Sequence, residues 1–277
     1  MPPSDPVPCR TLINGVWSHL IPVQDRGFQY GDGLFETILV RDARLHYWQA
    51  HMQRLNEGCQ RLKIRFPGEQ LLYQEASMMT LHQPEGVLKV IVTRGEGGRG
   101  YYPAKNGSAT RVLSMHALPD YSRTWSQQGI SARICDQRLS SHPVLAGLKH
   151  LNRLEQVLAR MEWDQQFQEG IMCDSRGNVV EGTMSNLFML EGNHLVTPGL
   201  VNCGVAGIMR GQVIKQASKV GLTLVEREIT IEALLASDGC FLTNSVIGLW
   251  PVRELQGRVW KTPDCFLTLA DMIRMDA

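Results

Sequence analysis

The sequence lacks paired cysteines and any familiar metal-binding spacing. Its seven cysteines are scattered, odd in number and never in a C-x-x-C pair: Cys9, Cys59, Cys135, Cys173, Cys203, Cys240 and Cys265. This pattern argues against a disulfide framework and a zinc site, so we expect reduced thiols and a cytoplasmic protein. The eight histidines include no H-E-x-x-H motif, and no metal is expected.

The sequence also lacks a dominant charge and a long apolar run. With 28 basic and 27 acidic residues the net charge is +1, so no global field favours nucleic acid or an anionic membrane. No stretch approaches a membrane span, and Met1–Asp5 has neither a basic start nor an apolar run. We therefore expect a soluble protein that binds neither nucleic acid nor a membrane. Its 277 residues suit one large or two modest domains with a sizeable core.

One lysine stands at the entrance of a predicted amphipathic helix. Gly147 permits a tight entry just before Lys149. Apolar residues then recur at helical spacing, and this spacing predicts a face packed on a core: Leu148, Leu151, Leu154, Leu158 and Met161. Taken alone, Lys149 is most simply read as a solvated charge.

A carboxylate and a glycine loop further along the chain change that interpretation. Glu181 begins a polar turn that leads into the apolar strand Leu187–Leu190. A lysine holds the aldehyde of pyridoxal 5'-phosphate as a Schiff base, and a carboxylate keeps the pyridine nitrogen protonated. Gly204–Gly207 precedes the helix predicted at Ile208–Val220, and such a helix start offers N–H groups and a positive dipole end to a phosphate.

These segments together resemble the class IV (fold-type IV) pyridoxal-phosphate enzymes. The likeness is carried by three motifs in the right order, Lys149–Ala159, Glu181–Phe188 and Gly204–Arg210, and it extends from about Asn14 to about Val252. Branched-chain aminotransferases, D-amino-acid aminotransferases and aminodeoxychorismate lyases belong to this family. Within it the sequence is most similar to the lyase branch, through Ala146–Leu158 and Gly207–Arg210.

The resemblance implies an α/β (α+β) fold of two domains with the cofactor at their junction, in a homodimer. The expected N-terminal α/β domain covers residues 1–116, and the C-terminal α/β domain, residues 126–277, carries Lys149. The linker is placed at 117–125, because the surrounding segment Met115–Gln128 contains Pro119 between apolar stretches.

The family's cofactor residues match eight positions of this sequence. Lys149 would carry the cofactor, Glu181 would face its ring nitrogen, and Arg54, on a helix predicted at Trp48–Leu62, would clamp its phosphate. The complete set implied by the resemblance is Lys149, Glu181, Arg54, Ser185, Asn186, Gly207, Ile208 and Asn244.

The substrate side rests on Thr37 and on a glycine-rich loop. Thr37 follows the turn Asp25–Gly33, and the matching position is a threonine in aminodeoxychorismate lyases. Arg94, Arg99 and Tyr101 match the lyase substrate loop, although Arg94 and Arg99 are also compatible with plain surface charges. Tyr101 departs from the Arg-x-His motif of D-amino-acid aminotransferases.

The same loop fits a dinucleotide-binding pattern, G-x-G-x-x-G, through Gly95, Gly97 and Gly100. That fingerprint should open a helix, whereas Tyr101–Gly107 contains Pro103 and cannot start one cleanly. A dehydrogenase is therefore disfavoured.

The activity implied is conversion of 4-amino-4-deoxychorismate to p-aminobenzoate and pyruvate by β-elimination, a step toward folate. Lys149 would act as the base, and either Lys149 or the Thr37 hydroxyl would protonate the departing group. The alternative is a class IV aminotransferase of the D-amino-acid or branched-chain type, which shares Lys149 and Glu181. A noncatalytic ligand-binding protein is the remaining alternative.

Overall fold

The computed structural model describes residues 10–103, 107–122 and 124–275. The chain divides into two compact units, one formed by Met1–Asp120 with Lys149–Asn152 and the other by Tyr121–Leu148 with Arg153–Ala277. The boundary after Asp120 falls inside the segment 117–125 that the sequence assigns to a linker. Residues 1–9 of the expected N-terminal domain, with Cys9, and residue 123 of the linker lie outside the described residues.

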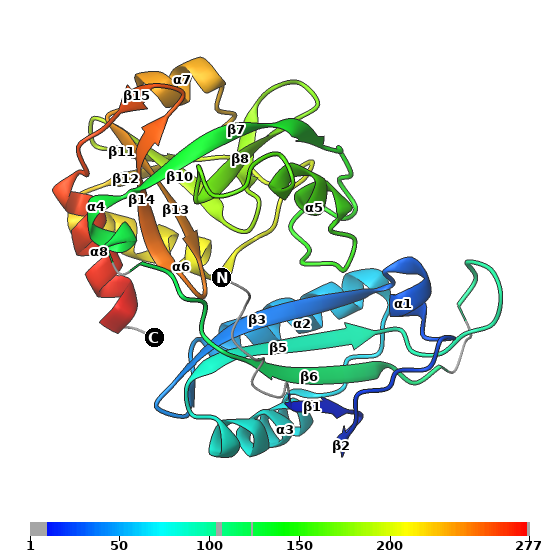
Figure 1. Ribbon diagram of the computed structural model, residues 1–277. Helices are drawn as coiled ribbons and strands as arrows, with labels where there is room; N and C mark the ends of the chain where they lie inside the picture. The colour runs from blue at the N-terminus through cyan, green and yellow to red at the C-terminus, as the bar shows by residue number, and fades with distance from the viewer. Residues whose placement is uncertain (1–9, 104–106, 123, 276–277) are drawn as a thin grey trace. The chain divides into compact units, whose positions relative to one another are not determined.

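The first unit contains a six-stranded antiparallel sheet in the order β2-β1-β6-β5-β3-β4 (Figure 1). Its strands are β1 (Arg10–Ile13), β2 (Val16–Trp17), β3 (Gly33–Arg41), β4 (Arg44–Leu45), β5 (Gly86–Thr93) and β6 (Thr110–His116). Asn14 and Gly15 take φ angles of 52° and 84° between β1 and β2, as a tight hairpin requires.

Three helices belong to this unit: α1 (Arg26–Tyr30), α2 (Trp48–Leu62) and α3 (Glu69–His82). Helix α2 packs on β3 and α3 packs on β6. The helix predicted at Trp48–Leu62 is confirmed with the same bounds, because Met52, Leu55 and Cys59 recur at helical spacing and are buried.

The lysine segment is extended rather than helical. The Phe35 amide donates to the Lys149 carbonyl at 3.0 Å, and the Leu151 amide donates to the Gly33 carbonyl at 3.0 Å. Lys149–Asn152 therefore lies along the first half of β3 and clusters with the first unit, whereas the sequence placed Lys149 in the C-terminal domain.

The helix expected around Lys149 begins only at Leu154, as α5 (Leu154–Arg160). Of the predicted apolar face, Leu148 is buried as expected. The prediction is wrong for the helix itself, since Leu154, Leu158 and Met161 are 75%, 51% and 75% exposed. The physical reason is that α5 packs on β7 through its buried Ala159, which leaves the larger apolar side chains on the outside.

The second unit contains a sheet of nine strands in the order β12-β11-β10-β13-β14-β7-β8-β9, with β15 beside β14. Pairing of β9 with β10 closes part of this path into a barrel. Strand β9 lies between β8 and β10 in this sheet. The strands are β7 (Ile130–Leu139), β8 (Glu169–Asp174), β9 (Val179–Gly182), β10 (Asn186–Glu191), β11 (His194–Thr197), β12 (Thr223–Glu226), β13 (Gly239–Asn244), β14 (Gly248–Leu255) and β15 (Arg258–Val259).

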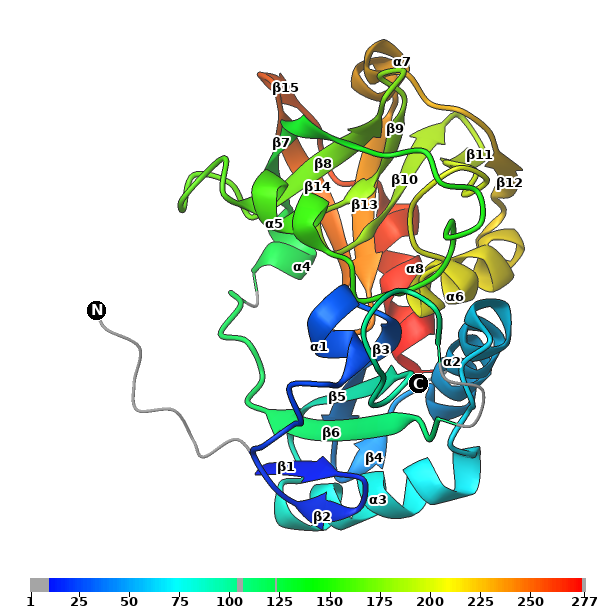
Figure 2. The ribbon, with the colours of Figure 1, turned by 90° about the vertical axis from the view of Figure 1, so that its right-hand side faces the viewer.

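Helices α6 and α8 of the second unit contact one another, and Figure 2 shows them side by side. The helix predicted at Ile208–Val220 is confirmed as α6 followed by a 3-10 turn, η1. The helices of this unit besides α5 are α4 (Trp125–Gln128), α6 (Ile208–Gln216), η1 (Ala217–Val220), α7 (Ile231–Ala236) and α8 (Asp264–Met275). The mixed class of helices and sheets expected from the sequence is confirmed.

None of the helices in the described ranges is long and apolar enough to cross a membrane.

Candidate active site

Lys149, Phe35 and Thr37 lie together in the first unit. The Lys149 ammonium nitrogen is 4.3 Å from the centre of the Phe35 ring. Thr37 is half-buried two residues further along β3, and side chains two apart on a strand share a face. Lys89 pairs with Thr37 across β3 and β5, and its Nζ is 5.2 Å from the same ring. Two amines thus lie near the Phe35 ring, and the Thr37 side chain is on the same face of the sheet.

On the opposite face of β3, Glu36 organises Arg54 on α2. The Glu36 carboxylate is 1% exposed. Arg54 donates to it through Nε, at 2.8 Å, and through Nη2. His51 Nδ1 lies 2.6 Å from Glu36 Oε2. The guanidinium predicted to clamp a phosphate is therefore held by a two-point ion pair, which fixes its plane.

Neighbouring charges and burial determine the ionisation of Glu36 and His51. Burial alone would raise the pKa of Glu36, but Arg54 and His51 lower it to about 2. Burial lowers the pKa of His51, against the carboxylate of Glu36, and the positive charges of Arg54 and Lys149 lower it further. The cluster therefore holds an ionised Glu36 between Arg54 and a neutral His51. Neither Glu36 nor His51 was a predicted site residue; the only signal was an acidic residue inside an apolar strand.

In the second unit Glu181 is fixed against the glycine loop. Glu181, at the end of β9, is 4% exposed, and its Oε2 accepts from the Val205 amide at 2.8 Å and from Asn186 Nδ2 at 3.3 Å. Asn186 Nδ2 also donates to the Val205 carbonyl at 2.8 Å. Burial lowers the pKa of Arg153, and the negative charge of Glu181 partly opposes this shift. Glu181, Asn186 and the loop before α6 thus form one hydrogen-bonded body.

The glycine that begins α6 leaves no room for a side chain. A Cβ at Gly207 would lie 2.0 Å from Asn186 Oδ1, and one at Gly204, where φ is 86°, would lie 2.7 Å from Leu200. Gly207 is the N-cap of α6, and no side chain among the described residues caps this helix start. The first-turn N–H groups from Ile208 onward are therefore not taken by a capping side chain, which suits an anion.

Ser185 and Asn244, two other predicted cofactor residues, hold turns. Ser185 Oγ donates to Glu169 Oε2 at 2.8 Å. Asn244 Nδ2 donates to the Met184 carbonyl at 3.0 Å, and its Oδ1 accepts from the amides of Val246 and Ile247. Both side chains are engaged within the second unit, next to the β9–β10 turn.

Glu169 is the carboxylate that shapes this turn, and sequence reasoning missed it. It is 1% exposed and accepts from the amides of Gly170, Thr183 and Met184 at 2.9, 3.1 and 3.2 Å. The hydroxyls of Thr183 and Ser185 donate to it as well. Burial raises the pKa of Glu169, and these hydrogen bonds oppose that shift. A lone glutamate at the start of a strand gave no signal of this role.

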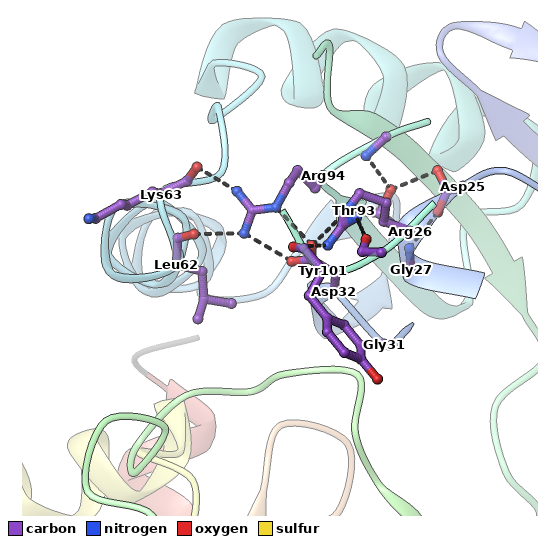
Figure 3. A network of polar contacts seen from close by, with 12 residues as sticks. Asp25, Arg26, Gly27, Gly31, Asp32, Leu62, Lys63, Thr93, Arg94 and Tyr101 are labelled. Atoms are coloured by element: carbon purple, nitrogen blue, oxygen red, sulfur yellow. Dashed lines mark hydrogen bonds and ion pairs between the residues drawn. The ribbon is translucent and has the colours of Figure 1, made fainter. Parts of the chain in front are cut away.

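Arg94 connects Asp32 to the end of α2 in the first unit (Figure 3). Its Nε and Nη2 donate to the Asp32 carboxylate at 2.8 and 3.0 Å. Its Nη1 and Nη2 donate to the carbonyls of Lys63 and Leu62, at the end of α2, at 2.7 and 2.8 Å. These bonds engage all three guanidinium nitrogens and hold Arg94 between Asp32 and the end of α2. Arg99 and Tyr101 are exposed.

The structure thus groups the predicted residues within each unit. In the first unit Lys149 lies near the Phe35 ring, on the same face of β3 as Thr37, and Glu36 binds Arg54. Glu181, Asn186, Gly207 and Ile208 form one end of the barrel in the second unit. The first unit supplies a primary amine and a guanidinium, which suit an aldehyde and a phosphate. The second unit supplies a buried carboxylate and an uncapped helix start, which suit a protonated ring nitrogen and an anion.

Comparison with known proteins agrees with this chemistry. Residues 33–255 match the family described as amino-transferase class IV. The chain is 36% identical over 244 residues to an aminodeoxychorismate lyase from Vibrio harveyi, covering 88% of this chain and 90% of that protein. It is 31% identical to a putative branched-chain-amino-acid aminotransferase from Methanocaldococcus jannaschii, covering 86% and 84%. The crystal structure of 4-amino-4-deoxychorismate lyase from Pseudomonas aeruginosa has a TM-score of 0.92 and 44% identity, covering 96% and 98%.

Proposed function

Because the chain belongs to the amino-transferase class IV family, we propose that it is a pyridoxal-phosphate-dependent lyase that converts 4-amino-4-deoxychorismate to p-aminobenzoate and pyruvate. Two relatives, at 36% and 44% identity, carry the name of this activity. The structural observation that supports the proposal is that Lys149 lies 4.3 Å from the Phe35 ring, which is on the same face of β3 as Thr37. An amine and a hydroxyl are thereby held on the same face of one sheet.

Pyridoxal 5'-phosphate is the cofactor of this family, and the residues present fit it. Lys149 would hold its aldehyde carbon. Arg54 and the uncapped start of α6 at Gly207 would hold its phosphate, and Glu181 would face its ring nitrogen. The expected residues Ser185 and Asn244 support the neighbouring turn in this proposal. When bound, the cofactor supplies an electron sink for a carbanion next to the substrate amine.

The chain's own residues account for the proton movements. The Lys149 amine takes the proton from the amine-bearing ring carbon of the substrate. Glu181 holds the proton on the ring nitrogen, because a buried carboxylate fixed by Val205 and Asn186 favours a positive partner. The bond between the adjacent ring carbon and the enolpyruvyl oxygen breaks, the ring becomes aromatic, and the enol takes up a proton to give pyruvate.

Thr37 is the residue proposed to favour elimination. Its hydroxyl would donate a hydrogen bond to the enolpyruvyl oxygen as negative charge develops there. Thr37 or Lys149 then supplies the final proton. Arg99, on the exposed loop after β5, would bind a substrate carboxylate through its forked guanidinium, and Tyr101 would contribute to the same substrate loop.

Product analysis tests the proposal. Purified protein supplied with pyridoxal 5'-phosphate should release p-aminobenzoate and pyruvate in equal amounts from 4-amino-4-deoxychorismate, with no 2-oxo acid added. A requirement for a 2-oxo acid acceptor, with amino-acid product, would instead identify a class IV aminotransferase. If the protein shows no visible absorption band, or none that borohydride bleaches, it is neither the lyase nor an aminotransferase.

The proposal extends to assembly and location. A homodimer is supported by exposed apolar side chains on and after α5, where Leu154, Val157, Leu158 and Met161 are 51–75% exposed. Light scattering should give about twice the chain mass of 31.1 kDa, and a single-chain mass would refute the dimer. A cytoplasmic location is supported by six unpaired cysteines in the described part of the chain. We also propose two domains along the chain, 1–116 and 126–277, joined by 117–125, with Lys149–Asn152 extending from the second into the first compact unit.

A further inference from the structure

Helix α1 and the loop after β5 are joined by a dense set of contacts in the first unit. Arg26, in α1, is only 4% exposed. Its Nη1 donates to the Gly100 carbonyl at 3.0 Å and its Nη2 donates to the Tyr101 carbonyl at 2.9 Å. Both carbonyls lie in the loop Gly95–Tyr101, which Figure 3 shows beside Arg26 through its labelled member Tyr101. The two terminal nitrogens of the Arg26 guanidinium, called the fork below, therefore bind two consecutive carbonyls at the exposed end of the loop.

The fork is itself held in place. Arg26 Nε donates to Asp32 Oδ2 at 2.9 Å, and the same oxygen accepts from Arg94 Nε at 2.8 Å. The Tyr30 ring lies 4.9 Å from the Arg26 guanidinium carbon and 5.6 Å from the Tyr101 ring. Arg26 thus stands between a fixed carboxylate and an aromatic pair, and its plane is determined from both sides.

The loop backbone is shaped to lie on this side chain. A Cβ at Gly97 would lie 2.9 Å from Arg26 Cδ, so only glycine lets the loop approach the arginine stem this closely. Gly95 and Gly100 take φ angles of 87° and 88°, which side chains rarely adopt. The G-x-G-x-x-G pattern is thus explained by the path of the loop: Gly97 lies against Arg26, a Cβ at Gly95 would lie 1.9 Å from the Ser108 carbonyl oxygen, and Gly100 has a positive φ.

We propose that Arg26 is a positioning residue that holds the Gly95–Tyr101 loop so that Arg99 is presented to the substrate. This inference rests on the proposed function, because Arg99 is assigned to a substrate carboxylate there. Arg26 acts through the carbonyls of Gly100 and Tyr101, directly after Arg99, and does not touch the substrate. Its removal should weaken substrate binding more than it slows turnover.

The test compares three variants of the full-length enzyme. Arg26→Met keeps an unbranched stem beneath Gly97 and deletes the fork, and Arg26→Lys keeps the charge but not the fork. Arg111→Gln is the matched control, because Arg111, in β6, makes a two-point ion pair with buried Glu75, in α3. Within the described part of the chain the Arg111 side chain has no hydrogen bond or ion pair with the loop. KM and kcat for 4-amino-4-deoxychorismate are measured for each. Tryptic cleavage after Arg99 is followed by mass spectrometry.

We expect Arg26→Met to raise KM about tenfold, with kcat within about twofold, a change of roughly 1.4 kcal/mol in apparent binding. Cleavage after Arg99 should become at least fivefold faster. Arg26→Lys should recover less than half of either effect, and Arg111→Gln should change neither. Unchanged cleavage in Arg26→Met would overturn the positioning role, and faster cleavage with unchanged KM would overturn its link to substrate. If the wild-type enzyme shows no lyase activity, the proposed function fails, while the cleavage comparison still decides whether Arg26 holds the loop.

Discussion

Arg54 donates hydrogen bonds to Glu36 through two nitrogens. Glu36 is buried, whereas 13% of the Arg54 side chain is exposed. An arginine held in this way presents a guanidinium of fixed plane and charge. Such a group suits an anion that arrives from outside the sheet. The account of the phosphate site depends on this pair.

Glu36→Gln tests the pair. Glutamine keeps the shape but removes the charge that orients Arg54, so the dissociation constant of pyridoxal 5'-phosphate should rise about tenfold or more. A spectroscopic titration of apoenzyme measures it. Glu75→Gln, which removes the carboxylate of the other buried two-point pair, is the control. Equal shifts in the two variants would mean that general destabilisation explains the effect.

The same carboxylate should make stability depend on pH. The pKa of Glu36 is about 2 in the fold against an ordinary 4.5, so its contribution is complete above pH 4.5 and is lost as pH falls toward 2. Burial lowers the pKa of His51, so stability is also lost as pH falls below the ordinary histidine value of 6.5. Between pH 5 and 2.5 the advantage of wild type over Glu36→Gln in unfolding free energy should shrink by roughly 2–3 kcal/mol. A constant difference measured by urea unfolding would contradict this assignment.

Gly207→Ala tests the helix start as a phosphate seat. The new methyl group would stand 2.0 Å from Asn186 Oδ1 and displace the amide that joins Glu181 to the loop, so cofactor affinity should fall at least tenfold. Gly211→Ala is matched to it, because a Cβ at Gly211, in the same helix, meets nothing within 4 Å. That control should bind cofactor normally and gain up to about 1 kcal/mol of stability from helix propensity. Equal affinities in the two variants would exclude this role for Gly207.

Thr37→Val tests the residue proposed to favour elimination. Valine keeps the shape and strand preference of threonine and deletes the hydroxyl. If the hydroxyl bonds the departing oxygen, pyruvate release should slow by about tenfold or more, equivalent to roughly 1.4 kcal/mol of barrier. The visible spectrum of bound cofactor should not change. Undiminished turnover would leave Lys149 as the proton donor.

Local apolar spacing predicted several helices and strands, but contacts between residues distant in the sequence determine the geometry of the site. The helix Trp48–Leu62 was predictable because its apolar spacing and its burial coincide. The leucine spacing around Lys149 misled, because the backbone of that segment bonds to β3, more than a hundred residues earlier. Spacing contains no information about such a partner.

The buried charges show the same limit. The ion pair of Arg94 was not predictable, because its partner Asp32 lies 62 positions away. Glu36, Glu169 and Arg26 belong to no recognisable motif. Their partners are distant in the sequence and become visible only in the fold. The motif residues Lys149, Glu181 and Gly207 were found because a family resemblance carries long-range information that periodicity does not.

The central claim is that Lys149 carries the cofactor, and Lys89 is its natural competitor, since the two ammonium nitrogens lie 4.3 and 5.2 Å from the same Phe35 ring. The most direct measurement is borohydride reduction of the enzyme with pyridoxal 5'-phosphate, followed by digestion and mass spectrometry of the pyridoxyl-labelled peptide. The account predicts the label on Lys149, present in Lys89→Ala and lost in Lys149→Ala. A label on Lys89 or on any other lysine, retained in Lys149→Ala, would contradict it.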